Sequence, residues 1–222
     1  VVGKGRMPEA EELQEALEYV LTPPTLTGQR ILITAGGTQE PIDPVRFISN
    51  YSTGKMGVAL AQVCARRGAE VTMVCGSMSV TPRNPFGAIH RIDALSAQDM
   101  YEVCIAQWPR MNSAILCAAV ADFTPCEKAE NKIKKGELKV ESQKSKVESQ
   151  KLKVESRESN VFSLSLKETA DIAKALGQSK RPDQKLIGFA LETQHEIENA
   201  LHKMERKNLD AIVLNSLRDK GA

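Results

Sequence analysis

Residues 31–57 read ILITAGGTQEPIDPVRFISNYSTGKMG, and the rest of the chain is interpreted from this stretch. Its first residues are apolar and end at Gly36-Gly37, a pattern typical of a buried parallel strand. After Ser52 and Thr53, which are candidate N-caps, apolar residues recur at helical spacing. The polar connection between strand and helix is longer than the usual roughly two to six residues. We therefore expect this connection to bind a ligand.

The strand end does not carry a dinucleotide-binding fingerprint. Gly36-Gly37 lacks the third glycine of that motif. The next expected strand, residues 70–75, ends at Cys75-Gly76 without the acidic residue that would bind a ribose 2′-hydroxyl.

The helix start is not a Walker A loop either, because Met56 follows Gly54-Lys55 where that motif needs Ser or Thr. What remains is a strand end next to a helix N-terminus. Free backbone N–H groups at these two places would suit phosphate oxygens.

The composition is that of an ordinary globular protein. Of the 222 residues, 41% are hydrophobic and 26% charged, and no apolar run reaches the roughly 18 residues of a membrane span. The N-terminal residues carry no secretory apolar region, so we expect a cytoplasmic protein. We expect five reduced thiols, mostly in the core: Cys64, Cys75, Cys104, Cys117 and Cys126.

Basic residues cluster locally although the net charge is only +2. One cluster spans residues 132–135 and another spans residues 203–207. A nucleic-acid duplex requires a broad basic face, so these clusters suit a small polyanion better, and we expect no nucleic-acid partner.

Strand and helix patterns alternate along most of the chain. This alternation predicts an α/β fold, a Rossmann-like doubly wound, mostly parallel sheet with helices on both faces. Expected helices cover residues 8–20, 54–67, 96–107 and 196–207, with another starting near 169. Expected strands cover residues 30–35, 70–75, 88–92, 113–119, 161–166, 185–191 and 210–214.

Residues 139–159 form three repeats of seven residues each, KVESQKS, KVESQKL and KVESRES. A heptad period is compatible with a coiled coil, but each repeat has one reliable apolar position and there are only three repeats. The composition favours a solvated insertion.

Residues 35–57, AGGTQEPIDPVRFISNYSTGKMG, closely resemble the signature loop of phosphopantothenoylcysteine synthetase, and the similarity extends from about residue 27 to 214. This family is the ligase half of a bifunctional bacterial coenzyme A biosynthesis protein. The resemblance implies a ligase that joins 4′-phosphopantothenate to L-cysteine through an acyl-cytidylate, with CTP as co-substrate, Mg²⁺ and a homodimer. Eukaryotic relatives favour ATP.

The resemblance also implies a domain organisation. Residues 1–28 would be the C-terminal tail of a preceding decarboxylase domain plus a linker. Residues 29–222 would be a C-terminally truncated ligase domain with the insertion at 139–159. FMN would belong only to the absent, covalently fused decarboxylase domain.

The resemblance implies roles for individual residues. Asn50 and Lys132 would be catalytic, Asn50 handling the substrate carboxylate and acyl-nucleotide and Lys132 offsetting phosphate charge. Arg46, with Asn50, would bind substrate. The nucleotide would contact Gly36, Gly37, Leu116, Cys117, Ala118, Asp122, Lys132, Ala170, Asp171, Ile172, Ala173, Phe189, Lys203 and Lys207. Metal ligands are not identified.

The sequence departs from the family pattern in two places, and two alternative functions stay open. Thr169-Ala170 replaces a usual Asn-Pro before Asp171, and Leu191 replaces a usual Ala. The alternatives are a nicotinamide-dependent oxidoreductase on a similar sheet and an inactive, truncated ligase fragment.

Overall fold

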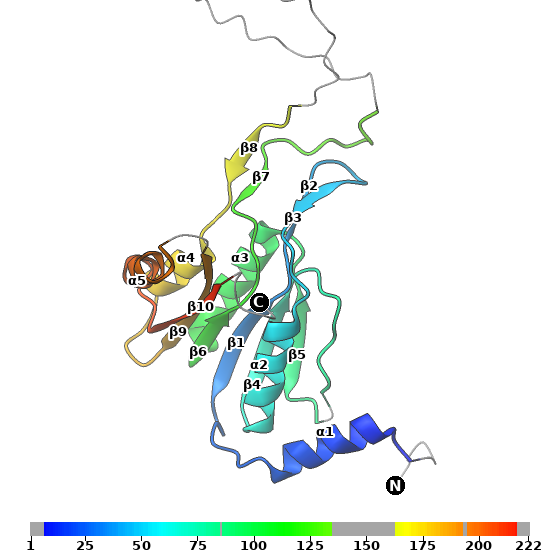
Figure 1. Ribbon diagram of the computed structural model, residues 1–222, viewed down its shortest axis with the longest axis vertical. Helices are drawn as coiled ribbons and strands as arrows, with labels where there is room; N and C mark the ends of the chain where they lie inside the picture. The colour runs from blue at the N-terminus through cyan, green and yellow to red at the C-terminus, as the bar shows by residue number, and fades with distance from the viewer. Residues whose placement is uncertain (1–6, 85, 135–162, 193–194, 217–222) are drawn as a thin grey trace, which may run out of the picture.

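The computed structural model describes residues 7–84, 86–134, 163–192 and 195–216. One sheet with all its neighbouring strands parallel forms the centre (Figure 1). Its order from edge to edge is β10–β9–β6–β1–β4–β5. The strands are β1 (Arg30–Ala35), β4 (Glu70–Cys75), β5 (Ile89–Asp93), β6 (Ser113–Leu116), β9 (Lys185–Glu192) and β10 (Ala211–Ser216).

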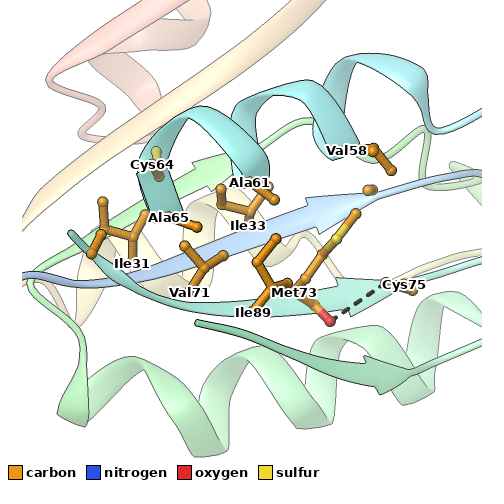
Figure 2. Close-up of a cluster of buried hydrophobic side chains, with 12 residues drawn as sticks. Ile31, Ile33, Val58, Ala61, Cys64, Ala65, Val71, Met73, Cys75 and Ile89 are labelled. Atoms are coloured by element: carbon orange, nitrogen blue, oxygen red, sulfur yellow. Dashed lines mark hydrogen bonds between the residues drawn. The ribbon is translucent and has the colours of Figure 1, made fainter. Parts of the chain in front are cut away.

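The two faces of the sheet are covered by different helices, because successive side chains of β1 point to opposite faces. Ile31 and Ile33 pack against α2 (Lys55–Arg66), as Figure 2 shows. Leu32 lies in a second buried cluster with residues of α3 (Ala97–Gln107) and α4 (Ile172–Gln178). A further helix, α5 (Glu196–Arg206), contacts β9 and β10. The predicted doubly wound α/β fold is confirmed.

Several predicted boundaries are wrong for identifiable reasons. The N-cap of helix α2 is Gly54, whose φ of 76° is left-handed, and not Ser52 or Thr53. The Oγ1 of Thr53 still accepts a hydrogen bond from Lys55 N at 3.4 Å. Helix α4 begins only at Ile172, because Asp171 is its N-cap. A strand predicted at residues 161–166 is instead β8 (Leu166–Glu168), while residues 161–162 lie outside the described part of the chain.

Two short antiparallel ribbons stand beyond the carboxyl edge of the sheet (Figure 1). One pairs β2 (Gln39–Pro41) with β3 (Phe47–Ser49), within the connection expected to be a binding loop. The other pairs β7 (Phe123–Pro125) with β8. Neither ribbon was predicted. The repeats at residues 139–159 lie outside the described residues.

Helix α1 (Ala10–Leu21) contacts α2, and the contact includes a buried ion pair. Glu15 is buried and accepts hydrogen bonds from Nε and Nη2 of Arg66, both at 3.0 Å. The apolar side chains of Leu17 and Leu21 are exposed. Whether residues 1–28 are the tail of another domain stays a prediction.

All five cysteines are free thiols. Cys64, Cys75 and Cys104 are buried, Cys117 is half-buried and Cys126 is exposed. Burial raises the pKa of Cys104 to about 12, so this thiol stays protonated at neutral pH. Within the described ranges, no helix combines the length and the apolar character that crossing a bilayer requires.

Candidate functional site

A cavity of about 400 Å³ lies where β1 and β6 end. The strand order reverses at this place. Strands β4 and β5 lie on one side of β1, whereas β6, β9 and β10 lie on its other side. In open parallel sheets, ligands bind outside the carboxyl ends of the strands at such a point. The cavity is lined by Thr34, Leu116, Ala118, Val120, Ala121, Asp122, Phe123, Glu168, Thr169, Ala170, Asp171, Ile172, Ala173, Phe189 and Lys207.

Three threonine hydroxyls fix the loop that follows β6. The Oγ1 of Thr34 accepts a hydrogen bond from the backbone N of Ala118 at 3.1 Å, and the Oγ1 of Thr38 accepts one from Ala121 N at 2.9 Å. The Oγ1 of Thr169 donates to Ala121 O at 2.6 Å. Because the loop is bonded both to the end of β1 with the turn after it and to Thr169, the wall of the cavity that carries Asp122 is held in place.

Asp171 and Lys207 bring opposite charges into the cavity. The Oδ1 of Asp171 accepts a hydrogen bond from Lys174 N at 3.0 Å, which caps α4, and its Oδ2 lies 3.0 Å from the Nζ of Lys207. Partial burial raises the pKa of the Asp171 carboxyl, but the bonds from Lys174 N and Lys207, with the nearby charges, outweigh burial and leave the pKa below its ordinary value. Asp171 is therefore ionised at neutral pH.

The cavity brings together many of the residues predicted to contact a nucleotide, although they come from separate segments. Those that line it are Leu116, Ala118, Asp122, Ala170, Asp171, Ile172, Ala173, Phe189 and Lys207. Cys117, between two lining residues, does not line the cavity, and burial raises the pKa of its thiol to about 11. Lys203 is one helical turn before Lys207 on α5, half-buried and outside the lining set.

The predicted phosphate cradle at Gly36-Gly37 has one of its two N–H groups already bonded. The backbone N of Gly37 donates to Ser77 O at 3.0 Å, so the prediction of a free N–H group there is wrong. Gly36 has φ of 82°, and a Cβ on it would lie 2.6 Å from both Ser77 O and Met78 Cγ. Backbone conformation and close packing therefore account for this glycine. Neither glycine lines the cavity.

Asn50 follows β3 and is exposed, beside the loop that leads to the cavity. Its Nδ2 donates to Ala119 O at 3.4 Å and to Val120 O at 3.2 Å. Val120 is itself a cavity residue.

Arg46 and Lys132 lie outside the set that lines the cavity. The Nε of Arg46 donates to Asp43 Oδ2 at 2.9 Å, and its Nη2 contacts the same oxygen and Ile133 O. Lys132 is exposed on the segment that these bonds hold. In this structure, most of the Arg46 guanidinium is thus engaged by the protein itself, and its substrate contact stays a prediction.

Sequence reasoning missed several lining residues, among them Thr34, Phe123, Glu168 and Thr169. Thr34 carried a signal, since it is polar within an apolar strand. Glu168 and Phe123 face each other in the β7–β8 ribbon, which has no pattern that predicts it. Among the described residues, no three or more His, Cys, Asp or Glu side chains cluster so that they could hold a metal ion.

Comparisons with known proteins bear on the whole chain. The profile of the family described as DNA/pantothenate metabolism flavoprotein C-terminal domain matches residues 26–146 and 141–222. A cysteine/cysteine sulfinic acid decarboxylase from an unknown prokaryotic organism is 45% identical over 100% of this chain and 56% of its own length. The coenzyme A biosynthesis bifunctional protein CoaBC of Haemophilus influenzae is 39% identical over 97% of this chain and 48% of its own length.

The chain thus spans about half the length of the curated relatives it matches. Among solved structures, the crystal structure of the C-terminal domain of a CoaBC protein is similar to this chain with a TM-score of 0.66 and 37% identity. That match covers 86% of this chain and 78% of the other.

Proposed function

The chain belongs to the DNA/pantothenate metabolism flavoprotein C-terminal domain family, and from this premise we propose that it is a ligase joining 4′-phosphopantothenate to L-cysteine, with CTP as co-substrate. Similarity to the C-terminal domain of a bifunctional coenzyme A biosynthesis protein supports this proposal. The observation that carries it is the cavity at the reversal of strand order, where nine residues of the inferred nucleotide site meet.

The cavity has the chemistry that a nucleotide needs. Phe189 offers an aromatic face for a base, and the backbone of residues 170–173 offers polar groups at its rim. Lys207 supplies a cation for phosphate oxygens, with Lys203 one turn away on α5. We assign Asp122 to the nucleotide as well. Gly36 and Gly37 act by shaping the strand end rather than by donating to phosphate.

The reaction would proceed in two steps. A carboxylate oxygen of 4′-phosphopantothenate attacks the α-phosphorus of CTP, forming a C(O)O–P bond while the bond to pyrophosphate breaks. The amine of cysteine then attacks the acyl carbon, CMP leaves, and the amine loses a proton. Lys132 would offset charge in the first step, and Asn50 would orient the acyl group in both, with Arg46 contributing to substrate binding.

Magnesium fits the residues present. Mg²⁺ is usually held by one or two carboxylates together with substrate phosphates. Asp122 and Glu168 both line the cavity and are the carboxylates that would hold it. The ion would neutralise charge on the triphosphate.

Other parts of the proposal concern the longer protein. FMN would belong to a preceding decarboxylase domain, and the decarboxylase name of one relative describes a protein almost twice as long as this chain. A homodimer and a cytoplasmic location stay predictions. Family membership favours the ligase over the nicotinamide-dependent oxidoreductase.

The decisive experiment measures pyrophosphate release from 4′-phosphopantothenate with CTP or ATP, first without cysteine and then with it, and identifies the products by mass. Release with CTP, followed by an amide product when cysteine is added, would support the ligase and its nucleotide together. Release only with ATP would overturn the choice of CTP. Nucleotide binding without release from either nucleotide would favour the inactive fragment.

A further inference from the structure

Asp43 lies in the turn between β2 and β3, with its side chain fully buried. Its Oδ1 accepts hydrogen bonds from the backbone N atoms of Val45 and Arg46, both at 2.8 Å. Its Oδ2 accepts from Arg46 and from the backbone N of Ile133 at 3.1 Å. Two of these bonds shape the turn, but the bond to Ile133 joins a segment ninety residues later in the chain.

The peptide units on both sides of Ile133 are held by the same pair of side chains. Asp43 accepts from its N–H, and the Nη2 of Arg46 donates to its C=O at 2.7 Å. A second backbone bond, from Ala129 N to Ile42 O at 2.9 Å, fastens the same segment to the ribbon. Residues 129–133 are therefore docked on β2–β3, and Lys132 lies between the two fastenings.

The ribbon is itself fixed to the sheet through other buried polar side chains. Glu40 is buried and its Oε1 accepts a hydrogen bond from Ala97 N, at the start of α3, at 2.8 Å. The Oγ1 of Thr38 accepts from Ala121 N. These bonds fix the ribbon itself, and neither of them reaches the segment that carries Lys132.

We propose that Asp43 is a positioning residue, which acts through Ile133 to fix where Lys132 presents its ammonium group. The role of Lys132 in this inference rests on the proposed function. The docking of Ile133 is independent of that function. A carboxylate is required because all groups that face Asp43 are donors: the guanidinium of Arg46 and three backbone N–H groups. The Arg46 guanidinium and these N–H groups hold the pKa of Asp43 well below its usual range despite burial, so the acceptor stays ionised.

The test compares Asp43→Asn with a matched control, Glu40→Gln. Both substitutions convert a buried carboxylate of the same ribbon into an amide, but only Asp43 contacts the Lys132 segment. Ile133→Pro deletes the N–H donor from the other side and leaves the ribbon unchanged, which provides a second variant if Asp43→Asn fails to fold.

The first readout needs no activity. Hydrogen exchange at the Ile133 amide should be slow in the wild-type protein and in Glu40→Gln. It should be faster in Asp43→Asn by roughly tenfold or more, the ratio expected for the loss of one charge-assisted hydrogen bond. An Ile133 amide that is unprotected in the wild-type protein would overturn the docking, whatever the enzyme does.

The second readout separates positioning from folding. We expect Asp43→Asn and Ile133→Pro to lower kcat for pyrophosphate release by roughly ten- to a hundredfold with little change in KM for CTP, since misplacing a reacting group by about 1 Å can cost a hundredfold. Glu40→Gln should keep the kcat of the wild-type protein, even if its stability is equal to or lower than that of Asp43→Asn.

If the Ile133 amide is protected in the wild-type protein but Asp43→Asn leaves kcat unchanged, the positioning role is overturned. An equal loss of kcat in Glu40→Gln would overturn it as well. A wild-type protein that releases no pyrophosphate from any nucleotide would remove the proposed function, and the exchange data would still decide whether Asp43 holds Ile133.

Discussion

Lys207 and Asp171 form an ion pair inside the cavity, with 3.0 Å between Nζ and Oδ2, although they lie on α5 and at the start of α4. The same carboxylate caps α4 through its other oxygen. Cap and ion pair therefore share one side chain, so a ligand that draws Lys207 away leaves the cap in place. This arrangement makes Lys207 available to phosphate without cost to the helix.

We expect Lys207→Gln to weaken binding of CTP by roughly tenfold or more, since a hydrogen bond to a charged group contributes about 1.5–3 kcal/mol and about 1.4 kcal/mol is tenfold. Binding of CMP should change much less, because it lacks the β- and γ-phosphates. Calorimetric titration with both nucleotides measures this difference. Lys174→Gln, a change of an exposed α4 lysine outside the cavity lining, is the matched control. Equal losses for CTP and CMP would contradict the assignment of Lys207 to the outer phosphates.

A second prediction concerns Asn50→Asp. The new carboxylate would face the carbonyl oxygens of Ala119 and Val120, to which the amide now donates. We expect pyrophosphate release to continue while amide formation stalls, so that an acyl-cytidylate accumulates and is detected by mass. Unfolding temperature is recorded in parallel, because loss of these two bonds also loosens the loop. Normal amide formation would remove Asn50 from the mechanism.

The contrasting variant is Lys132→Gln, which should abolish formation of the acyl-cytidylate itself. Lys132 is exposed, so its loss should leave the unfolding temperature unchanged, within the roughly 0.5 kcal/mol typical of surface substitutions. Wild-type rates of pyrophosphate release in this variant would rule out the role given to Lys132.

The sequence predicts the main sheet well because its strands are apolar runs bounded by turns. The strand at residues 70–75 was predicted with the bounds that the structure has, and α3 within one residue. The ribbons β2–β3 and β7–β8 could not be predicted in this way. Their strands have three residues each, and β2–β3 is held by distant contacts of buried Thr38, Glu40 and Asp43 rather than by its own pattern.

The site was only partly predictable for a related reason. Sequence similarity can indicate that Asp171 and Lys207 both serve a nucleotide, but not that they pair with each other across 36 residues. Nor can a sequence separate a glycine needed for a ligand from one needed for packing. Gly36 looked like the former, and Ser77 and Met78 account for it as the latter.

The contacts of Met78 allow a stability test of the conclusion that Gly36 is needed for packing. A Cβ on Gly54 would lie 2.6 Å from Met78 Sδ and would meet no other residue among its three nearest atoms, whereas a Cβ on Gly36 would also meet Ser77 O. Each substitution to alanine should cost about 1–3 kcal/mol from the left-handed backbone alone. Met78→Ala should offset part of the loss in Gly54→Ala but little of that in Gly36→Ala. Urea unfolding of the single and double variants measures these differences, and equal offsets at both glycines would contradict the packing explanation.

A pH prediction follows from Asp210. Partial burial opposes ionisation of its carboxyl, but bonds from Lys180, Leu186 N and Lys185 lower the pKa from 3.8 to about 2. The folded state therefore binds fewer protons than the unfolded state between these values. The stability that Asp210 contributes is full above pH 3.8 and is lost as pH falls toward 2. Unfolding measured across this range should show a shallower acid dependence in Asp210→Asn, and an unchanged slope would contradict the assignment.

The strand order also has a consequence for how the molecule forms. Ile31 of β1 pairs with Val71 of β4 and with Ser113 of β6. The ribosome therefore synthesises this residue of β1 40 residues before its partner in β4 and 82 residues before its partner in β6. On the ribosome β1 must wait with one edge unpaired until β6 has emerged. Proteins dominated by such distant pairings fold slowly. During synthesis, therefore, the apolar strand at the centre of the finished sheet is among the segments most in need of protection from aggregation.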